Sequence, residues 1–465
     1  MVDGESPMAG AGGRLPAERA ALLLSPDKDT AEIEALLRSS GLRLVGTFVQ
    51  RMESPNPKYY LGEGKVGQIA KLVKRSAGNG KAGKKRGART AGTDEILGDD
   101  EGDDADALAE RPELAVFNGN LKPTQVFHLE KTLGIPVFDR IRLILEIFTR
   151  RANSPEARLQ VELAHLQYDV PLVREYIHRT HTGEHPGLFY AGGAYQVDDY
   201  YEMRKSRMAR IRRELQRIGG ERAQRRKTRR RGGQALLSLA GYTNAGKSAL
   251  FRALCSEDAS VGDELFTTLS TTTRRLRFPV QGSKVLLTDT VGFIRNLPPW
   301  LVEAFMSTLE EVFLSDAIIL VLDISDAPDE MLSKLETTLS ILRKGERSIP
   351  IVLAFNKTDL LDEPGTRGRM ESILAKHNLE KNCAVSALSG RGLGELVGLA
   401  LSSLPDFFFG TVTGPEEELW ALGAEGVQPR TPAGGGRAVA GTVLLRNWKM
   451  AELARKYPSL VFSKA

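Results

Sequence analysis

The chain has 465 residues, of which 41% are hydrophobic and 26% are charged. These proportions are typical of folded globular proteins, so they exclude a chain that is disordered throughout, a collagen-like repeat and a coiled-coil rod. At roughly 100 to 200 residues per domain, the length predicts about three domains. The net charge of +5 is unevenly spread, because residues 204–231 hold 14 basic residues against two acidic ones and leave the remainder of the chain acidic.

Three features predict a cytoplasmic protein. The strongest apolar run, Ala317 to Leu322, has six residues, far fewer than the roughly 20 that cross a bilayer, so we expect no membrane span. Residues 1–19 are expected to be a flexible N-terminus, with Asp3 and Glu5 where a signal peptide would be basic. Two cysteines are too few for a disulfide framework and fit a reducing compartment.

Residues 20–150 are predicted to form a small α/β domain, because strand patterns alternate with helical periodicity. The predicted elements are strands at Ala20–Leu24, Leu42–Gln50 and Leu114–Phe117 and helices at Ala31–Leu37 and Pro123–Leu133. Residues 76–112 interrupt this domain with a basic block followed by an acidic block. Because this segment has almost no apolar side chains to offset the entropy of ordering, we predict a disordered insertion there.

Residues 151–232 are predicted to form an antiparallel helical hairpin with an arginine-rich segment. Ser154 is the expected N-cap and Pro155 the first helical residue. One helix carries an apolar stripe at Leu159, Leu163 and Leu166, the other carries one at Met208, Ile211, Leu215 and Ile218, and the connection runs from Pro171 to Val197. These spacings would turn the arginine-rich segment toward the outside of the hairpin.

The arginine-rich segment, residues 204–231, indicates a polyanionic partner, and the phosphates of RNA or DNA are the first candidate. The alternative is a solvated helix face followed by a charged linker. Binding to a membrane surface is disfavoured, because no exposed aromatic face accompanies the arginines.

Residues 233–405 are predicted to form a doubly wound α/β domain that begins with a phosphate-binding loop. The strand Ala235–Ala240 leads into Gly-x4-Gly-Lys-Ser and then into a helix at Ala249–Leu254, which is the required strand–loop–helix setting. Backbone N–H groups are expected to wrap the phosphates, Lys247 to reach the β and γ oxygens, and Ser248 to ligate Mg²⁺. The loop consists of Gly241, Tyr242, Thr243, Asn244, Ala245, Gly246, Lys247 and Ser248.

Two further segments are expected near the metal and the γ-phosphate. After the strand Val285–Leu287 come Asp289, Thr290, Val291 and Gly292. They would place a carboxylate beside the metal and a glycine N–H toward the γ-phosphate, although an ordinary strand-to-turn boundary has the same pattern. Upstream lies a hydroxyl-rich segment suited to a switch that closes on Mg²⁺, with Thr271, Thr272 and Thr273 as rival switch threonines. This segment consists of Phe266, Thr267, Thr268, Leu269 and Ser270.

Guanine selectivity is predicted from the residues after two later strands. The strand Ile351–Phe355 is followed by Asn356, Lys357, Thr358 and Asp359. The carboxylate of Asp359 can accept hydrogen bonds from guanine N1–H and N2–H₂ together, whereas adenine has no such donor pair. The strand Cys383–Val385 leads to Ser386, Ala387 and Leu388, whose backbone is expected to contact guanine O6.

The predicted fold class is therefore α/β, with a P-loop GTPase domain preceded by a small α/β domain and an antiparallel helical hairpin. Residues 406–465 are predicted to form a small C-terminal region. The predicted reaction is hydrolysis of GTP to GDP and phosphate, with GTP or GDP as ligand and Mg²⁺ as cofactor.

The sequence resembles the HflX GTPases over roughly residues 20–405. The resemblance rests on the phosphate-binding loop, on Leu265–Leu269 and Asp289–Ile294, and outside the GTPase domain on Tyr60–Val66, Leu133–Arg140 and Arg158–Leu163. It implies binding to the large ribosomal subunit and its RNA, with ribosome splitting or rescue, often under stress, as the role. It also points to Thr268 as the magnesium-binding threonine. We accordingly expect a monomer in which Lys247, Thr268 and Gly292 act in catalysis and Ser248 and Thr268 hold the metal.

One departure from this family lies in the connection between the two helices. Bacterial members carry a Gly-Pro-Gly-Glu-Thr-Gln-like motif there that approaches the peptidyl-transferase centre. The corresponding residues here are Ala191–Gln196, in which Ala194 replaces the glutamate. The stretch resembles the archaeal branch more closely.

Two residues leave the mode of hydrolysis open. Phe293 occupies the position after Gly292 at which faster GTPases often hold a water-orienting glutamine. A GTP-gated RNA-binding or ribosome-assembly module with incidental hydrolysis is therefore the alternative function. Asn244 either holds a potassium ion against the phosphates or merely tolerates a tight loop conformation.

Overall fold

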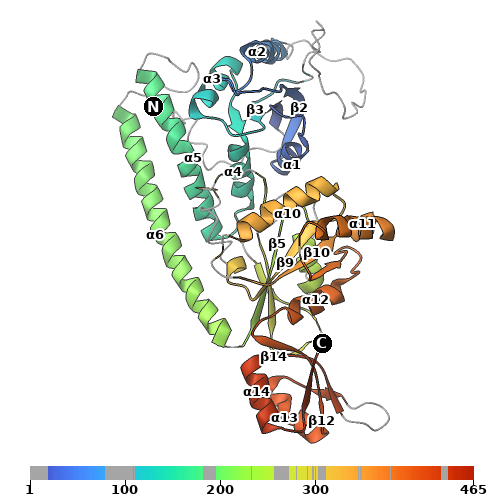
Figure 1. Ribbon diagram of the computed structural model, residues 1–465. Coiled ribbons are helices and arrows are strands. Elements are labelled where there is room, and N and C mark those ends of the chain that lie inside the picture. Colours follow the sequence, from blue (N-terminus) through green and yellow to red (C-terminus); the bar gives the residue numbers. More distant parts are fainter. Residues whose placement is uncertain are drawn as a thin grey trace. The chain divides into compact units, whose positions relative to one another are not determined.

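The computed structural model describes residues 19–78, 108, 110–181, 195–231, 233–255, 272–278, 280–290, 292–295, 298, 300–301, 311–343, 345, 348–377, 379–430 and 438–465. The chain divides into two compact units, Met1–Gln216 and Arg217–Ala465 (Figure 1). Each unit is described by itself. Most of the predicted insertion, residues 79–107 and 109, lies outside the described residues, as does the family-specific connection at 191–194.

The first unit opens with a four-stranded parallel sheet in the order β2-β1-β3-β4. Its elements are β1 (Arg19–Ser25), α1 (Ala31–Ser39), β2 (Leu42–Val49), α2 (Glu63–Gly78), β3 (Leu114–Phe117), α3 (Pro123–Leu133), β4 (Val137–Asp139) and α4 (Arg140–Arg151). The predicted strands and helices of this region are confirmed to within two residues. Strands β1 and β3 are buried along their length, as expected for parallel strands that helices cover on both faces.

A buried carboxylate joins this sheet to the helices that follow. Asp139 at the end of β4 accepts hydrogen bonds from the backbone N–H of Arg142 at 2.8 Å and from the Tyr168 hydroxyl at 2.9 Å. Burial raises the pKa of Asp139, and these hydrogen bonds oppose the rise. Asp139 therefore caps α4 and at the same time anchors the next helix.

The two long helices α5 (Pro155–His181) and α6 (Tyr195–Arg231) run antiparallel where ion pairs connect them. Arg204 Nη1 donates a 2.8 Å hydrogen bond to Asp169 Oδ2, and Arg207 Nε donates a 2.6 Å hydrogen bond to Glu162 Oε1. Two arginines of the arginine-rich segment are thus engaged with α5, Arg204 buried and Arg207 half-exposed. The backbone N–H of Ala157 donates to Ser154 Oγ at 3.1 Å, which confirms the predicted N-cap.

The predicted start of the connection at Pro171 is wrong, because α5 continues through this proline to His181. A proline inside a helix removes one backbone hydrogen bond and costs about 3 kcal/mol. Beyond the proline, however, Val173 is buried, so tertiary packing holds the helix together. The buried face is also less apolar than predicted, since Gln160 and His165 are buried beside Leu163.

Two adjacent glycines, Gly219 and Gly220, lie in the middle of α6. A methyl group at either position would meet open space, so neither close packing nor a positive φ requires glycine there. Each glycine weakens the helix by about 1 kcal/mol relative to alanine. Among the described residues no helix is long and apolar enough to span a membrane.

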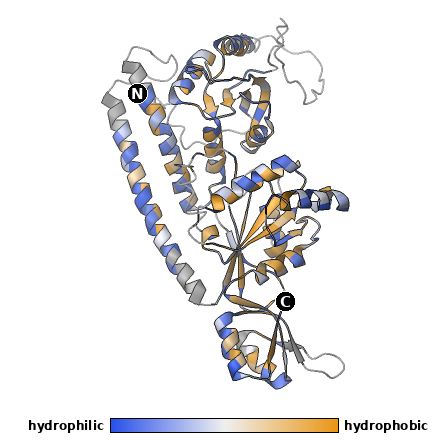
Figure 2. Ribbon diagram, in the orientation of Figure 1, coloured by the Kyte–Doolittle hydropathy of each residue, from blue (hydrophilic) through white to orange (hydrophobic). Residues whose placement is uncertain are grey.

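The second unit is built on a six-stranded sheet in the order β11-β10-β9-β5-β8-β6, parallel except for the edge strand β6. The elements are β5 (Ala235–Gly241), α7 (Lys247–Cys255), β6 (Thr272–Arg275), β7 (Gln281–Gly282), β8 (Val285–Asp289), β9 (Ala317–Asp323), α10 (Pro328–Leu342), β10 (Ile351–Asn356), η2 (Thr358–Leu360), α11 (Glu363–Leu374), β11 (Asn382–Ala384) and α12 (Leu393–Ser402). The predicted doubly wound domain is confirmed. Its central strands are hydrophobic along their length (Figure 2).

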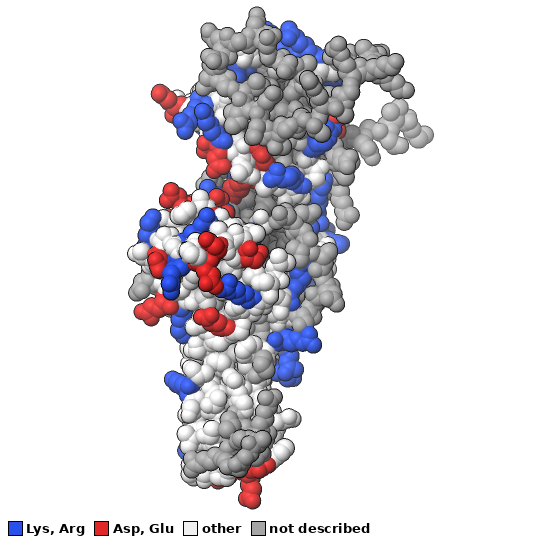
Figure 3. Space-filling view, turned by 90° about the vertical axis from the view of Figure 1, so that its right-hand side faces the viewer, with Lys and Arg blue, Asp and Glu red and all other residues white. Residues whose placement is uncertain are grey.

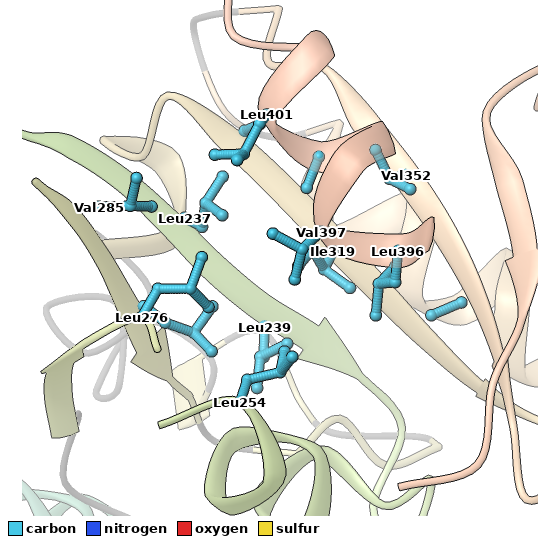
Figure 4. Close-up of a cluster of buried hydrophobic side chains, with 14 of the residues drawn as sticks. Leu237, Leu239, Leu254, Leu276, Val285, Ile319, Val352, Leu396, Val397 and Leu401 are labelled. Atoms are coloured by element: carbon cyan, nitrogen blue, oxygen red, sulfur yellow. The ribbon is translucent and has the colours of Figure 1, made fainter. Parts of the chain in front are cut away.

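A second, smaller sheet follows in residues 407–464. It contains β12 (Phe407–Gly414), β13 (Pro429–Arg430), β14 (Ala438–Arg446) and β15 (Val461–Lys464), with α13 (Glu416–Ala421), η3 (Leu422–Glu425) and α14 (Asn447–Lys456) between them. Strand β14 also pairs with β7 of the preceding domain. Figure 4 shows Leu237, Ile319 and Val397 in the hydrophobic cluster of the six-stranded sheet and its helices. Phe407, Phe409 and Leu444 belong to the same cluster.

Candidate nucleotide-binding site

The candidate site lies at the carboxyl ends of five strands, β5, β8, β9, β10 and β11, which is where ligands bind in open α/β sheets. Each predicted motif that the structure describes follows one of these strands. Five predicted residues of the switch segment, Phe266, Thr267, Thr268, Leu269 and Ser270, lie outside the described residues, as does Val291.

The phosphate-binding loop is held in its tight conformation by three residues with positive φ. They are Gly241 (+148°), Asn244 (+62°) and Gly246 (+88°). A Cβ on Gly241 would lie 2.3 Å from the carbonyl oxygen of Val321, and a Cβ on Gly246 would lie 2.2 Å from Asn356 Nδ2. Only glycine fits at these two positions, whereas the left-handed conformation of Asn244 matches the loop-forming role considered for it.

Lys247 lies at the start of α7 and is buried. Its ammonium group donates a 2.7 Å hydrogen bond to the carbonyl oxygen of Tyr242. Desolvation lowers the pKa of Lys247 to about 8, against the opposing effect of the negative charge on Asp289. A buried cation of this kind is stabilised by an anion placed beside it, and a phosphate group supplies one.

Ser248 and Asp289 bring two oxygen ligands together across the site. The hydroxyl of Ser248 donates to Asp289 Oδ2 at 2.8 Å, and the backbone N–H of Thr290 donates to Asp289 Oδ1 at 3.0 Å. The hydroxyl of Thr290 donates to the carbonyl oxygen of Leu239 at 2.6 Å, which ties the ends of β8 and β5 together. Oxygen donors of this type fit Mg²⁺, which takes few protein ligands and keeps several waters.

Gly292 and Phe293 run alongside the phosphate-binding loop. Phe293 N–H donates to the carbonyl oxygen of Gly241 at 3.1 Å, and Thr243 N–H donates to the carbonyl oxygen of Phe293 at 2.8 Å. A Cβ on Gly292 would lie 2.9 Å from Lys247 Nζ, so the glycine lets the backbone approach the ammonium group. The Phe293 side chain is buried, and because it has no polar atom it cannot orient a water molecule by hydrogen bonding.

Asn356 joins the phosphate-binding loop to the predicted guanine loop. Its Nδ2 donates to the carbonyl oxygen of Ala245 at 2.9 Å, and its Oδ1 accepts from the backbone N–H of Ala387 at 3.0 Å. Next to it, Asp359 is exposed and accepts a 2.5 Å hydrogen bond from the Ser386 hydroxyl through Oδ1. Leu388 is 84% exposed. The residues after β10 and β11 are thus brought together as predicted, with a carboxylate turned toward solvent.

One contact in this part of the site was not predicted. Lys357 Nζ forms a 2.7 Å ion pair with Asp323 Oδ2, the last residue of β9. The signal in the sequence is weak, because Asp323 only ends an apolar run. Its position at the carboxyl end of a parallel strand is what places it in the site.

The comparisons with known proteins cover most of the chain. Three family models match it: a GTP-binding GTPase N-terminal domain at residues 27–80 and 94–149, a GTP-binding GTPase middle region at residues 151–229, and a 50S ribosome-binding GTPase at residues 237–357. The chain is 40% identical over 367 residues to the GTPase HflX of Thermococcus kodakarensis, covering 78% of this chain and 74% of that one. It is 35% identical over 382 residues to the GTPase HflX of Akkermansia muciniphila, covering 80% and 79%.

A solved structure is also similar. The GTP-binding protein from the hyperthermophilic archaeon Sulfolobus solfataricus, in complex with GDP, aligns with a TM-score of 0.43 and 25% identity over 82% of this chain and 98% of that one. Archaeal relatives are among the most similar proteins, in agreement with the branch that the resemblance indicated.

Replacing Asp359 by Asn exchanges a double acceptor for a side chain with one acceptor and one donor. We expect Asp359→Asn to lose affinity for GDP by at least about tenfold, since one charged hydrogen bond is worth about 1.5–3 kcal/mol. The variant should instead prefer xanthosine diphosphate, whose O2 accepts where guanine donates. Titration calorimetry with the two nucleotides measures the exchange, and equal affinity of the parent chain for ADP and GDP would contradict the assignment.

The lowered pKa of Lys247 links nucleotide binding to pH. The pKa of Lys247 is about 8 in the folded apo protein, against the ordinary value of 10.5. Between these two pH values the folded protein has lost the proton that the unfolded chain still holds, so the free energy of unfolding should rise with pH. A bound phosphate holds the proton, so GDP binding should take up a proton above pH 8 and its affinity should fall. Calorimetry at pH 7 and pH 9 in buffers of different ionisation enthalpy measures the uptake. Lys247→Arg, which stays charged, is the control that retains only the titration of guanine itself.

Proposed function

The chain belongs to the HflX family of GTPases, and on that premise we propose that it associates with the large ribosomal subunit and uses GTP to split or rescue ribosomes, often under stress. The observation that carries this proposal is the match of residues 237–357 to the 50S ribosome-binding GTPase model. Hydrolysis would then set how long the factor stays bound. The site described above supports the GTP-dependent part of the proposal, and α6 supports the RNA-dependent part.

The site residues divide the work of hydrolysis as follows. We propose that Lys247 neutralises the charge that develops on the β and γ oxygens, an interaction that its burial would make stronger than in water. The backbone at Gly292 approaches Lys247 closely enough for its N–H to serve the same phosphate. We propose that Ser248 and Thr268 would bind Mg²⁺ directly. The metal ion would supply positive charge to stabilise the phosphate oxygens.

The buried Phe293 implies slow intrinsic turnover. No glutamine side chain stands at this position to orient the attacking water, so we infer that the bound ribosomal partner completes the site. The same observation favours the alternative function, a GTP-gated RNA-binding or ribosome-assembly module in which hydrolysis is incidental. Single-turnover hydrolysis with and without large subunits separates the two, because only the first requires strong stimulation.

The outward face of α6 supports binding to ribosomal RNA. Lys205, Arg210, Arg212 and Arg213 are exposed there, whereas Arg204 and Arg207 are engaged with α5. Arg225, Arg226, Arg229 and Arg230 belong to the same helix, but their side chains are not among those that the structure describes. Exposed arginines on one helix neutralise phosphates and release their counterions, which makes binding depend steeply on salt.

We expect the triple variant Arg210→Ala, Arg212→Ala and Arg213→Ala to bind large subunits more weakly and to flatten the dependence of log Kd on log salt by about two, at roughly 0.7 per phosphate contact. GTP affinity should not change. Co-sedimentation with ribosomal subunits in GTP, GDP and a non-hydrolysable analogue at several salt concentrations measures both effects.

The matched control for this experiment replaces Arg343, Arg367 and Lys376, three exposed basic residues of the second unit, by alanine. Figure 3 shows that acidic and basic side chains are interspersed over the GTPase-domain face turned to the viewer. An unchanged salt slope in the α6 variant, or an equal change in the control, would mean that the α6 face is only solvated.

Asn244 provides a separate test of how the transition state is stabilised. We propose that a potassium ion beside Asn244 supplies the charge that an arginine finger supplies elsewhere. Asn244→Gly keeps the positive φ of this residue and removes only the side chain. Potassium should therefore accelerate hydrolysis over sodium in the parent and not in this variant. If both cations give the same rate in the parent, Asn244 serves the loop conformation alone.

A further inference from the structure

Asp323 is a buried residue of the nucleotide site. It is the last residue of β9 and pairs with Asn356 of β10 in the sheet register. Its side chain is 9% exposed, against 24% for that of its partner Lys357. A carboxylate this deeply buried is stable only where charges and hydrogen bonds satisfy it.

Both oxygens of Asp323 are occupied. Oδ2 makes the 2.7 Å ion pair with Lys357 Nζ. Oδ1 accepts from Ser325 twice, from the backbone N–H at 2.9 Å and from the hydroxyl at 2.6 Å. Ser325 therefore fixes the direction of the carboxylate, and the carboxylate in turn fixes the end of the Lys357 side chain.

Lys357 has an unfavourable backbone conformation, with a φ of +67°. This conformation turns the chain from β10 into the short helix η2, which carries Asp359. The next residue, Thr358, donates its backbone N–H to the carbonyl oxygen of Val385 at 3.3 Å. A left-handed residue other than glycine persists only where its surroundings hold it, and the ion pair to Asp323 is one such restraint.

We propose that Asp323 is a positioning residue of the guanine site, which holds Lys357 so that Asp359 and the alkyl chain of Lys357 meet the base in a fixed geometry. This inference deepens the proposed function, because it rests on the assignment of guanine binding to Asp359. The competing explanation is that Asp323 only closes a local turn through Ser325. In that case the ion pair to Lys357 would be incidental and nucleotide affinity would not depend on it.

The test is the affinity of Asp323→Asn for GDP, measured by titration calorimetry and by the release rate of a fluorescent GDP analogue. Loss of the charged hydrogen bond should weaken binding by about tenfold, mainly through faster release. GDP should still bind more tightly than xanthosine diphosphate, because the carboxylate of Asp359 is intact and still supplies both acceptors.

Asp316→Asn is the matched control. Asp316 immediately precedes the same strand at its other end. Counted as whole residues, Asp316 is 8% exposed and Asp323 is 7% exposed. Asp316 accepts a 2.9 Å hydrogen bond from the backbone N–H of Leu236. It should lower the melting temperature without changing GDP affinity. If the two variants lose affinity in proportion to their loss of stability, Asp323 is merely structural and the proposal is wrong.

A double-mutant cycle with Lys357→Met tests the route of the effect. In the Lys357→Met background, Asp323→Asn should cause no further loss, because the ion pair is already gone. The double variant leaves no unpaired buried charge and so supplies the comparison even if Asp323→Asn alone does not fold. A further tenfold loss in the double variant would overturn the proposal. Failure of the guanine assignment itself would appear differently, as equal affinity of the parent chain for ADP and GDP.

Discussion

The nucleotide site depends on one buried amide. Asn356 donates to the carbonyl oxygen of Ala245 and accepts from the N–H of Ala387, so a single side chain sets the distance between the loop that receives phosphates and the loop that receives the base. An amide suits this role because it offers a donor and an acceptor at opposite ends without a charge that burial would penalise. Gly246 has to be glycine for the same reason, since any Cβ would collide with the amide nitrogen. Asn356 thus holds the two loops at one fixed spacing.

Two charged side chains, Lys247 and Asp289, are buried beside this frame, and a bound phosphate would offset part of the desolvation cost of the cation. Lys247 is a buried cation whose pKa has fallen, and Asp289 is a buried anion held by Ser248 and Thr290. Preorganised groups of this kind need no rearrangement when charge develops on a phosphate, which is the main source of electrostatic catalysis. Taking such charges out of water costs free energy, which their hydrogen-bond partners and a bound phosphate offset.

The sequence was informative where chemistry restricts the residue type and uninformative where distant packing decides. The phosphate-binding loop and the Asn356–Asp359 motif were predictable because glycine, lysine and aspartate each meet a requirement that few other residues satisfy. Pro171 misled, because a local rule about helices was overridden by the burial of Val173. Asp323 was missed because its partner Lys357 stands 34 positions away in the numbering and meets it only through strand pairing. The role of Thr268 stays a prediction, whereas the rival threonines Thr272 and Thr273 lie in β6, where the Thr273 and Thr288 hydroxyls share a 2.9 Å hydrogen bond.

The shared core of the second unit has a consequence for how this protein is made. Phe407, Phe409 and Leu444 are the last members, in chain order, of a cluster that otherwise ends at Leu404. During synthesis the GTPase sheet therefore emerges before the side chains that finish its core, and its apolar surface stays uncovered until β14 arrives to pair with β12 and β7. Completion of the nucleotide-binding domain thus waits on residues that contribute nothing to nucleotide chemistry. A nascent chain halted before Leu444 would leave apolar surface of this sheet exposed to chaperones and proteases.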